Sequence, residues 1–375
     1  MIDFMSKKIE ELECFTENLQ QDDKIVGVSM AVIYNNQLIY DKGIGSSRLS
    51  PNQEMTSDTI MSIQSITKSF AAVSIMHLVE DGLIELDSPL VDYLPYFRTS
   101  IKEESDRITV RQILSHTAGL PSDVGIANII TPNRHEMEGY KEWQEELNIS
   151  NGVIESIQSF EDITRYFKDV ELAYTPGEKW MYCTDAYVIV GDLFEKVSGV
   201  SWKDHIQENI FNKLDMNRST LDPEKASSDP DSSRFYTEIN SIVEETPYPT
   251  NIIAAPIGFI YASAKDIAKY LAASFNYDQR SLLKTQSLKN MHQPYPNVEV
   301  TFPFTDVNNI GYGLGWGTSK YKGFHLIDHG GGYTGVSARV SMIPSEKLGV
   351  VVLANSDRTN TREIAMKAIN IFLDR

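Results

Sequence analysis

Cysteine is scarce in this chain of 375 residues, which holds only Cys14 and Cys183. Two cysteines provide no disulfide framework, so a small disulfide-held fold is excluded. Positive charge is also in short supply, because 34 lysines and arginines stand against 52 acidic residues, for a formal net charge of −18. This surplus of negative charge argues against nucleic acid and anionic membrane surfaces as partners.

Long apolar runs are missing as well. No apolar segment approaches the roughly 18 residues that a membrane-spanning helix needs, so we expect no such helix. The first residues, MIDFMSKKIEEL, have no basic stretch leading into an apolar run, and they predict an amphipathic helix rather than a signal peptide. A cytoplasmic protein is therefore expected. With 41% hydrophobic residues, the chain is long enough to bury a large core.

A serine and a lysine stand three residues apart, at Ser65 and Lys68, where a helical pattern begins. Residues i and i+3 share one helix face, so the two side chains are expected to meet. A serine hydroxyl is a weak nucleophile until a base takes its proton, and a desolvated lysine is such a base. The apolar run that follows, FAAVSIMHLVEDG, predicts a buried helix whose N-terminus favours developing negative charge. The pair therefore predicts a covalent serine hydrolase.

The same spacing occurs twice more, at Ser281/Lys284 and at Ser319/Lys322. The first pair lies in a short polar stretch, and the second in a turn-rich run after Gly-Trp-Gly. Neither serine opens a buried helix, so both pairs are interpreted as chance matches.

Residues 59–95 resemble the serine β-lactamase and penicillin-binding-protein superfamily, in particular its class C β-lactamase, esterase and D-alanyl-D-alanine-peptidase branch. Four later segments are similar to motifs of this branch, in the same order: LSHTAGLP (114–121), PGEKWMY (176–182), APIGFIYASAKD (255–266) and HGGGYTG (329–335). The resemblance implies an α/β (α+β) fold of the β-lactamase/transpeptidase type, with no cofactor. In that fold an antiparallel sheet flanked by terminal helices meets a mostly helical lobe, and the active site lies at their junction.

Tyr182 follows a Pro-Gly turn and precedes an apolar helical run. A phenol with a pKa of about 10 becomes a useful base only where cations stabilise its phenolate. Lys68 can supply that charge, and the resemblance makes Tyr182 the third catalytic residue; a core tyrosine is the alternative. The usual Tyr-x-Asn motif ends here in Thr184, whose hydroxyl replaces an amide. This departure weakens the case for β-lactam turnover and favours an ester or an unusual amide as the substrate.

The usual Lys-Thr-Gly of the third motif is replaced by His329-Gly330-Gly331. Glycines let a substrate approach the backbone closely, as an oxyanion hole requires. Motif alignment assigns the oxyanion donors to the backbone N–H groups of Ser65 and Gly332. His329, charged only in part near neutral pH, is expected to bind a substrate carboxylate or to assist proton transfer. The substrate-binding residues implied by the resemblance are Thr184, His329, Gly330, Gly331 and Tyr333.

His325, Asp328 and His329 cluster closely enough to raise the question of a metal site. Histidines at i and i+4 suit zinc on a helix, whereas this segment predicts a strand. We therefore expect no metal. His116, in a Ser-His-Thr-Ala-Gly turn, is interpreted as a residue that pins a helix end.

The apolar segments predict one antiparallel sheet between terminal helices. Its strands are expected at 27–34, 37–43, 325–328, 337–343 and 348–353, with a closing helix at 361–373. Residues 1–59 and 256–375 are predicted to form a discontinuous sheet domain, and 60–255 a mostly helical one, as a single catalytic unit. Two polar stretches, 122–160 and 221–250, predict long loops over the site.

The sequence thus predicts a serine hydrolase that cleaves a small ester or amide, of the D-amino-acid peptide or β-lactam type, through an acyl-enzyme on Ser65. Small esters, amides or short peptides are the expected partners. A non-catalytic binding or scaffold protein with the same fold is the alternative, supported by Thr184, and a metallohydrolase is a third possibility. Intact mass after exposure to an acylating agent distinguishes among them.

Overall fold

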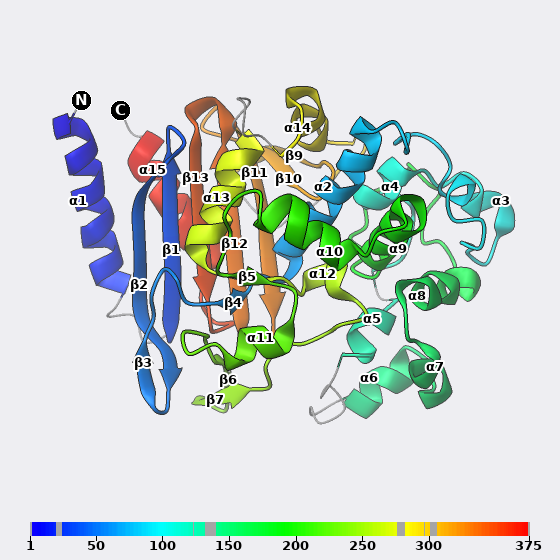
Figure 1. The fold of residues 1–375 in the computed structure, drawn as a ribbon, viewed down its shortest axis with the longest axis horizontal. Coiled ribbons are helices and arrows are strands. Elements are labelled where there is room, and N and C mark those ends of the chain that lie inside the picture. The colour runs from blue at the N-terminus through cyan, green and yellow to red at the C-terminus, as the bar shows by residue number, and fades with distance from the viewer. Residues whose placement is uncertain are drawn as a thin grey trace.

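An eight-stranded antiparallel sheet occupies the left-hand half of the computed structural model as drawn in Figure 1, and most of the short helices lie to its right. The structure describes residues 2–19, 25–122, 124–131, 140–275, 282–295, 297–300 and 306–373. In spatial order the strands are β3 (Asn52–Glu54), β2 (Gln37–Leu49), β1 (Gly27–Tyr34), β13 (Leu348–Ala354), β12 (Val336–Ile343), β11 (Phe324–Tyr333), β10 (Gly317–Tyr321) and β9 (Asn308–Tyr312). The two ends of the chain therefore build one sheet, as the predicted fold requires.

Helices cover both faces of the sheet because its central strands are apolar on both sides. In β13, Val350 and Val352 face one core, and Val351 and Leu353 face the other. The first core lies under α1 (Ile2–Leu19) and α15 (Thr361–Leu373). The second lies under α13 (Ala264–Phe275) and continues into the helical part of the molecule. Both predicted terminal helices are confirmed.

The helical part surrounds α2 (Thr67–Glu80), which runs away from the sheet and packs against α9 (Ala186–Ser198) and α12 (Ala255–Gly258). Most residues of α2, polar ones included, are buried, so this helix is enclosed on all sides, with Phe70 and Ile75 fully buried. The helices α10 (Trp202–Ile206) and α14 (Thr285–Met291) also contact α2, and α4 (Val110–Leu114) and α8 (Phe160–Tyr166) pack on α9. The short helix α3 (Lys102–Ser105) lies at the outer edge of this part (Figure 1). A small sheet joins β4 (Met61–Ser62), β8 (Tyr261–Ala262) and β5 (Ser219–Thr220) beside them.

The two polar stretches that were predicted to be long loops contain regular structure, so that prediction is wrong. The first holds α5 (Ile126–Ile129), α6 (Tyr140–Glu146) and α7 (Asn151–Ser156), while residues 123 and 132–139 lie outside the described part. The second holds α11 (Pro223–Ser228) and a hairpin of β6 (Phe235–Ile239) and β7 (Ile242–Thr246). Local caps explain the difference, because Ser150 accepts a hydrogen bond from Val153 N and Asp222 caps α11.

Two features of the sheet also depart from expectation. β9 and β10 were not predicted, and Ser319, placed in a turn-rich run, lies in β10. β11 extends beyond the predicted segment through three glycines to Tyr333, because β12 pairs with it along its whole C-terminal half. Pairing with a neighbouring strand thus overrides the weak strand preference of glycine.

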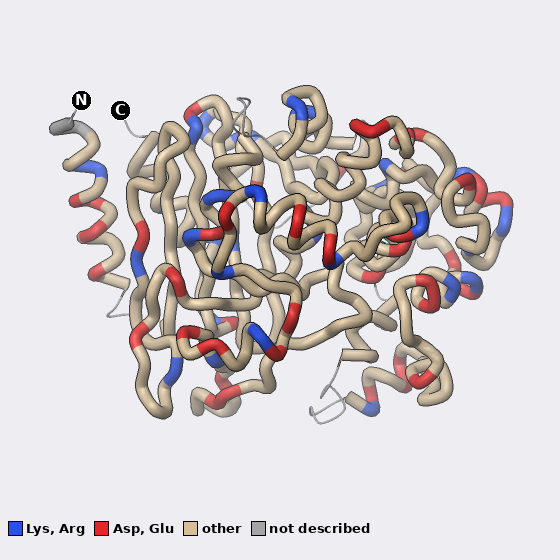
Figure 2. Tube along the Cα trace, in the orientation of Figure 1, with Lys and Arg blue, Asp and Glu red and all other residues tan. Residues whose placement is uncertain are grey.

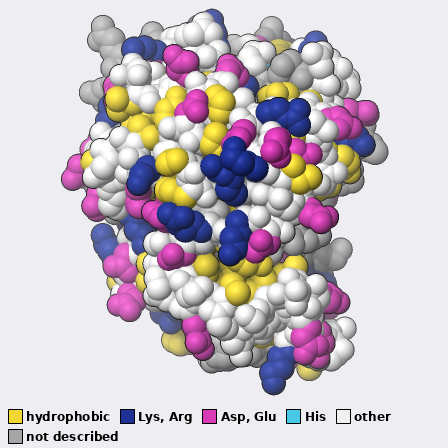
Figure 3. All heavy atoms as spheres, turned by 90° about the vertical axis from the view of Figure 1, so that its right-hand side faces the viewer, with side chains coloured by type: hydrophobic (Ala, Val, Ile, Leu, Met, Phe, Trp, Pro, Cys, Tyr) yellow, Lys and Arg dark blue, Asp and Glu magenta, His cyan; other side chains and the backbone are white. Residues whose placement is uncertain are grey.

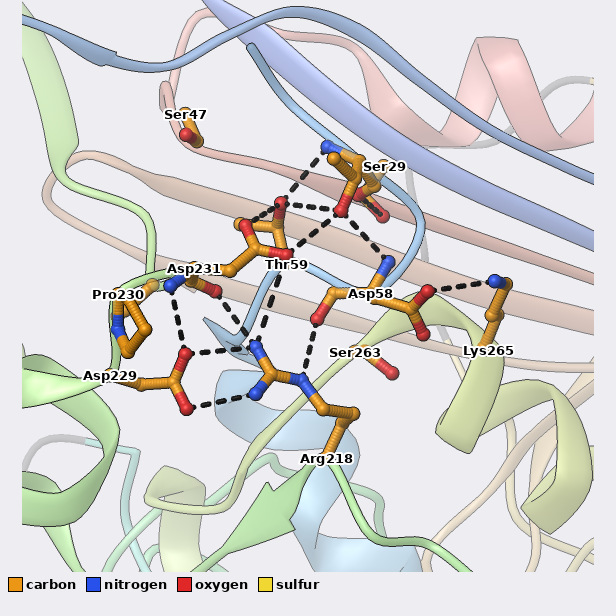
Figure 4. A network of polar contacts seen from close by, with 12 residues as sticks. Ser29, Ser47, Asp58, Thr59, Arg218, Asp229, Pro230, Asp231, Ser263 and Lys265 are labelled. Carbon is orange, nitrogen blue, oxygen red and sulfur yellow. Dashed lines mark hydrogen bonds and ion pairs between the residues drawn. The ribbon is translucent and has the colours of Figure 1, made fainter. Parts of the chain in front are cut away.

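A polar network clasps the sheet to the neighbouring segments (Figure 4). The Arg218 guanidinium donates to both carboxylate oxygens of Asp229, at 2.8 and 3.0 Å, and to the carbonyl oxygens of Asp58 and Asp231, both at 3.1 Å. Lys265 bridges Asp58, at 2.8 Å, and Asp41 of β2, at 3.1 Å.

Charges of both signs lie along the outer helices and turns (Figure 2). On the face at the right-hand end of Figure 1, Lys and Arg side chains gather near the centre with Asp and Glu side chains around them (Figure 3). The negative net charge therefore does not give this face a single sign. Among the described helices, none combines the length and apolar character needed to cross a membrane.

Candidate active site

Ser65 lies in a 3-10 turn, Gln64–Ile66, that leads directly into α2. Gln64 has a φ of +47°, which is unfavourable for a residue with a side chain. Its side-chain amide donates to Ser62 Oγ at 2.8 Å, and this bond helps to hold the tight turn. Ser65 is thereby fixed at the start of a buried helix, as the sequence predicted.

Lys68 is fully buried in the first turn of α2, and its amine faces the serine. Lys68 Nζ lies 3.0 Å from Ser65 Oγ and 2.6 Å from the carbonyl oxygen of Ile257 in α12. Burial lowers the pKa of Lys68 to about 7, although the nearby Asp185 carboxylate opposes this shift. A large fraction of Lys68 is therefore an uncharged amine near neutral pH, and such an amine is able to accept the Ser65 proton.

Tyr182 lies on the other side of the serine. Its phenol hydrogen-bonds to Ser65, and its ring centroid is 5.2 Å from Lys68 Nζ. Burial raises the pKa of Tyr182 above its ordinary value, against the smaller effect of the Ser65 hydrogen bond. The phenol therefore keeps its proton, and the geometry favours Lys68 as the base and Tyr182 as a proton donor.

β11 runs past the serine turn at its glycines. An added Cβ at Gly331 would lie 2.3 Å from the carbonyl oxygen of Ile63, so only glycine allows this close approach. At Gly332 the corresponding position is open, with no atom within 4 Å. Gly332, which was assigned as the second oxyanion donor, is therefore the residue directly after Gly331, where β11 contacts the turn that holds Ser65.

His329 of β11 is buried, and both of its ring nitrogens are engaged. Nδ1 lies 2.7 Å from the carbonyl oxygen of Gly330, and Nε2 lies 2.8 Å from the hydroxyl of Tyr312. Burial, with the nearby Lys68 cation, lowers the pKa of His329 to about 3. The imidazole is therefore neutral at physiological pH, which does not favour the expected role toward a substrate carboxylate.

A cavity of about 280 Å³ opens at Ser65. Aromatic rings of Trp180, Tyr182 and Tyr312 line it, together with Gly317, His329, Gly330 and an ion pair between Asp328 and Arg339. A larger hollow of about 530 Å³, lined in part by Phe15, Leu19 and Ile364, holds no serine–lysine pair among its described lining residues.

The structure brings together Ser65, Lys68, Tyr182, His329 and the β11 glycines. Thr184 and Tyr333 are half-buried and, within the described part of the chain, do not line the cavity. Ser319 lies in β10, and Ser281 falls outside the described residues. None of the aromatic residues of the two former loops lines the cavity, and Phe235 and Tyr236 are buried.

Several lining residues were not singled out from the sequence. Trp180 carried a signal, since it belongs to the PGEKWMY motif, whereas Tyr312 and Arg339 carried none. Asp185 is buried and accepts hydrogen bonds from Gly125 N at 3.2 Å and Ala127 N at 2.7 Å, so it caps α5. The described residues contain no group of three or more potential metal-ligating side chains.

The fold and the serine–lysine–tyrosine group define the class of protein: a serine hydrolase superfamily with the β-lactamase fold. Within this class, the chain belongs to the Beta-lactamase family, whose model matches residues 14–371.

Solved structures of related proteins share this fold. The octameric penicillin-binding protein homologue of Pyrococcus abyssi is 28% identical, with a TM-score of 0.81 over 98% of this chain and 78% of that chain. A D-stereospecific amidohydrolase from Streptomyces sp. is 22% identical, with a TM-score of 0.73 over 94% of this chain and 95% of that one. A class C beta-lactamase is 21% identical, with a TM-score of 0.75 over 97% and 96%.

Among curated proteins, Protein flp of Staphylococcus aureus (strain MW2) is 23% identical over 92% of this chain. The chain spans 63% of the length of that relative. Serine beta-lactamase-like protein LACTB, mitochondrial, of Mus musculus is 22% identical over 91% of this chain and 73% of its own length.

Proposed function

We propose that this protein is a serine hydrolase that cleaves a small ester or amide through an acyl-enzyme on Ser65. The observation that carries the proposal is the 3.0 Å contact between Ser65 Oγ and a fully buried lysine amine. A buried amine with a pKa of about 7 is a base matched to neutral pH.

In the proposed reaction the Lys68 amine takes the Ser65 proton while Oγ bonds to the substrate carbonyl carbon. The backbone N–H groups of Ser65 and Gly332 donate to the oxyanion that develops. The tetrahedral intermediate collapses as the bond to the leaving group breaks, and Tyr182 donates the proton that this group needs. Water then attacks the acyl carbonyl carbon while the Tyr182 phenolate takes a proton from the water. The bond to Ser65 Oγ breaks as the Lys68 ammonium returns a proton to this oxygen, so that Ser65, Lys68 and Tyr182 regain their starting states.

The cavity favours an uncharged group of the substrate. Its rings offer apolar surface, His329 is neutral, and the Arg339 charge is paired with Asp328. A substrate carboxylate that enters this cavity loses its hydration. Among the described lining residues, the cation available to it, Arg339, is already paired with Asp328. We therefore favour a neutral ester or amide over a carboxylate-bearing β-lactam. D-Amino-acid peptides and β-lactams remain the other substrates to be tested.

The second candidate is a binding protein that keeps the fold without turnover. Thr184 in place of the usual asparagine is the observation that favours it, because a short hydroxyl lacks the paired donor and acceptor of an amide.

Intact-protein mass spectrometry after exposure to a neutral fluorophosphonate and, separately, to a penicillin tests the proposal. We expect one fluorophosphonate adduct on wild type and none on Ser65→Ala. Ser319→Ala, which removes the serine of another Ser-x-x-Lys pair, is the control and should keep the adduct. The penicillin adduct should form more slowly or not at all. A folded wild-type protein that forms no adduct with either reagent refutes the serine-hydrolase proposal and favours the binding protein.

A further inference from the structure

His116 directly follows the turn that ends α4, and its backbone has a φ of +58°. Few residues with a side chain adopt this left-handed conformation, in which histidine, asparagine and aspartate are enriched. The side chain is only 3% exposed and does not line the cavity at Ser65. The turn brings His116 alongside residues 179–183, a segment with neither helix nor strand.

Two hydrogen bonds from this one residue bracket Tyr182. The His116 carbonyl oxygen accepts from Met181 N at 2.9 Å, and its ring Nδ1 accepts from Cys183 N at 3.3 Å. Met181 and Cys183 are the residues immediately before and after Tyr182. The backbone on both sides of the tyrosine is therefore held by His116 in a segment that has no strand or helix of its own.

The His116 ring also packs on the tyrosine itself. Its centroid lies 4.2 Å from that of Tyr182 and 5.0 Å from that of Tyr312, so it forms the wall behind the phenol. Because Nδ1 accepts a hydrogen bond, the ring proton of neutral His116 lies on Nε2, which has no hydrogen-bond partner among the described residues. Only the neutral ring has an acceptor nitrogen, so the contact with Cys183 requires the neutral form.

We propose that His116 is a positioning residue for Tyr182: it orients the phenol that protonates the leaving group and takes no part in binding substrate. The inference deepens the proposed function, on which it rests, and it goes beyond the interpretation of His116 as a pin for a helix end. A residue that merely ends α4 needs only the left-handed turn. Bracketing Tyr182 also needs an acceptor atom at the Nδ1 position and a flat ring behind the phenol.

The test compares His116→Leu with His116→Asn. Leucine keeps apolar volume but removes the acceptor, so kcat should fall by about 10- to 100-fold, as expected when a supporting contact of a reacting group is lost. KM should stay within about twofold, because His116 does not reach the cavity. Asparagine places Oδ1 where Nδ1 was and tolerates a positive φ. His116→Asn should therefore show at most half of the increase in the free energy of activation that His116→Leu shows.

The choice of leaving group provides a readout that a purely structural role would not move. Nitrophenolate leaves without a proton, whereas an alkoxide needs one. With p-nitrophenyl and ethyl esters of the same acid, His116→Leu should slow the ethyl ester at least fivefold more than the p-nitrophenyl ester.

His292→Leu is the matched control. His292 is also buried, and its Nε2 also lacks a partner among the described residues, but its ring packs against Trp316. This variant should lose comparable thermal stability with little change in kcat. The inference is overturned if folded His116→Leu keeps wild-type kcat, if asparagine restores nothing, or if both esters slow equally. A wild type without a Ser65 adduct would instead refute the proposed function itself, so the two failures are distinguishable.

Discussion

At the scale of single residues, Lys68 has the clearest consequence for activity. Its amine is completely enclosed, and burial lowers its pKa to about 7. Only the deprotonated amine takes the Ser65 proton, so kcat/KM should rise with pH through about 7 and level off above it. At pH 5 about 1% of the base form remains, which predicts a rate about 100-fold lower.

The rate of fluorophosphonate labelling between pH 5 and 9 measures this profile without a known substrate. Lys68→Arg provides the comparison, because a guanidinium stays protonated and should abolish labelling over the whole range. A flat profile in wild type, or a midpoint above pH 9, would contradict the role of Lys68 as base.

Some of these residues were predictable from sequence and others were not. The spacing of Ser65 and Lys68 within a helical pattern sufficed, because a helix fixes the geometry of its own neighbours. Ile257 O, which accepts from Lys68, is 189 residues away, and no local pattern announces such a contact. His116 was interpreted from its turn alone, since its contact with Cys183 spans 67 residues.

At the scale of elements, strong periodicity predicted correctly and weak periodicity did not. The terminal helices and the strands β1, β12 and β13 are where their apolar residues placed them. β9 and β10 escaped prediction because their polar and glycine-rich sequences depend on pairing with β11. The short helices α5, α6, α7 and α11 escaped because one or two turns leave little periodic signal.

The packing of α9 on its neighbours makes a prediction about stability. Asp192 on α9 is 5% exposed, and its carboxylate oxygens lie 3.0 and 3.1 Å from the hydroxyl of Tyr96. Burial raises the pKa of Asp192 to about 6, although hydrogen bonds from Thr164 and Tyr96 oppose the shift. The folded state therefore binds this proton more tightly than the unfolded state. The resulting stabilisation is full below pH 4 and is lost as the pH rises through 6.

Asp192→Asn removes the buried charge and keeps an acceptor for Tyr96. At pH 7.5 the variant should have a free energy of unfolding about 1–2 kcal/mol above that of wild type, and the gain should vanish near pH 4. Urea unfolding followed by circular dichroism at the two pH values measures this difference. The exposed Asp169→Asn is the control and should differ little from wild type at either pH. An Asp192→Asn gain that is equal at both values would contradict the argument.

At the scale of the whole molecule, the structure confirms the predicted fold class, an antiparallel sheet with terminal helices and further helices beside it. This fold was predictable because the motifs occur in the family's order. The expected partners, the cytoplasmic location and the division at residues 59 and 255 stay predictions. The segments joined by the polar network around Arg218 are distant in sequence, and Arg218, Asp229 and Asp231 lie outside the motifs, although Lys265 belongs to the APIGFIYASAKD segment. Arg218 and Asp58, for example, are 160 residues apart.

The clasp at Arg218 makes the final prediction (Figure 4). Its guanidinium donates four hydrogen bonds to two segments of the chain, one at Asp58 and one at Asp229–Asp231, and removing it deprives the Asp229 carboxylate of two charged donors. Hydrogen bonds to charged groups contribute more than neutral ones, so Arg218→Ala should lower the free energy of unfolding by about 3 kcal/mol. Arg218→Lys should lose less, since an ammonium keeps the charge without the planar fork.

Lys102→Ala is the matched comparison, because Lys102 pairs with Asp106 on an exposed helix. Such a surface pair contributes at most about 0.5 kcal/mol, so Arg218→Ala should lower the free energy of unfolding several-fold more than Lys102→Ala does. Urea unfolding at low and high salt separates the cases further, since salt screens an exposed pair more than a partly buried network. If Arg218→Ala costs no more than Lys102→Ala, the sheet and its surroundings are held together by apolar packing alone. The network would then serve only to align segments that the two cores already stabilise.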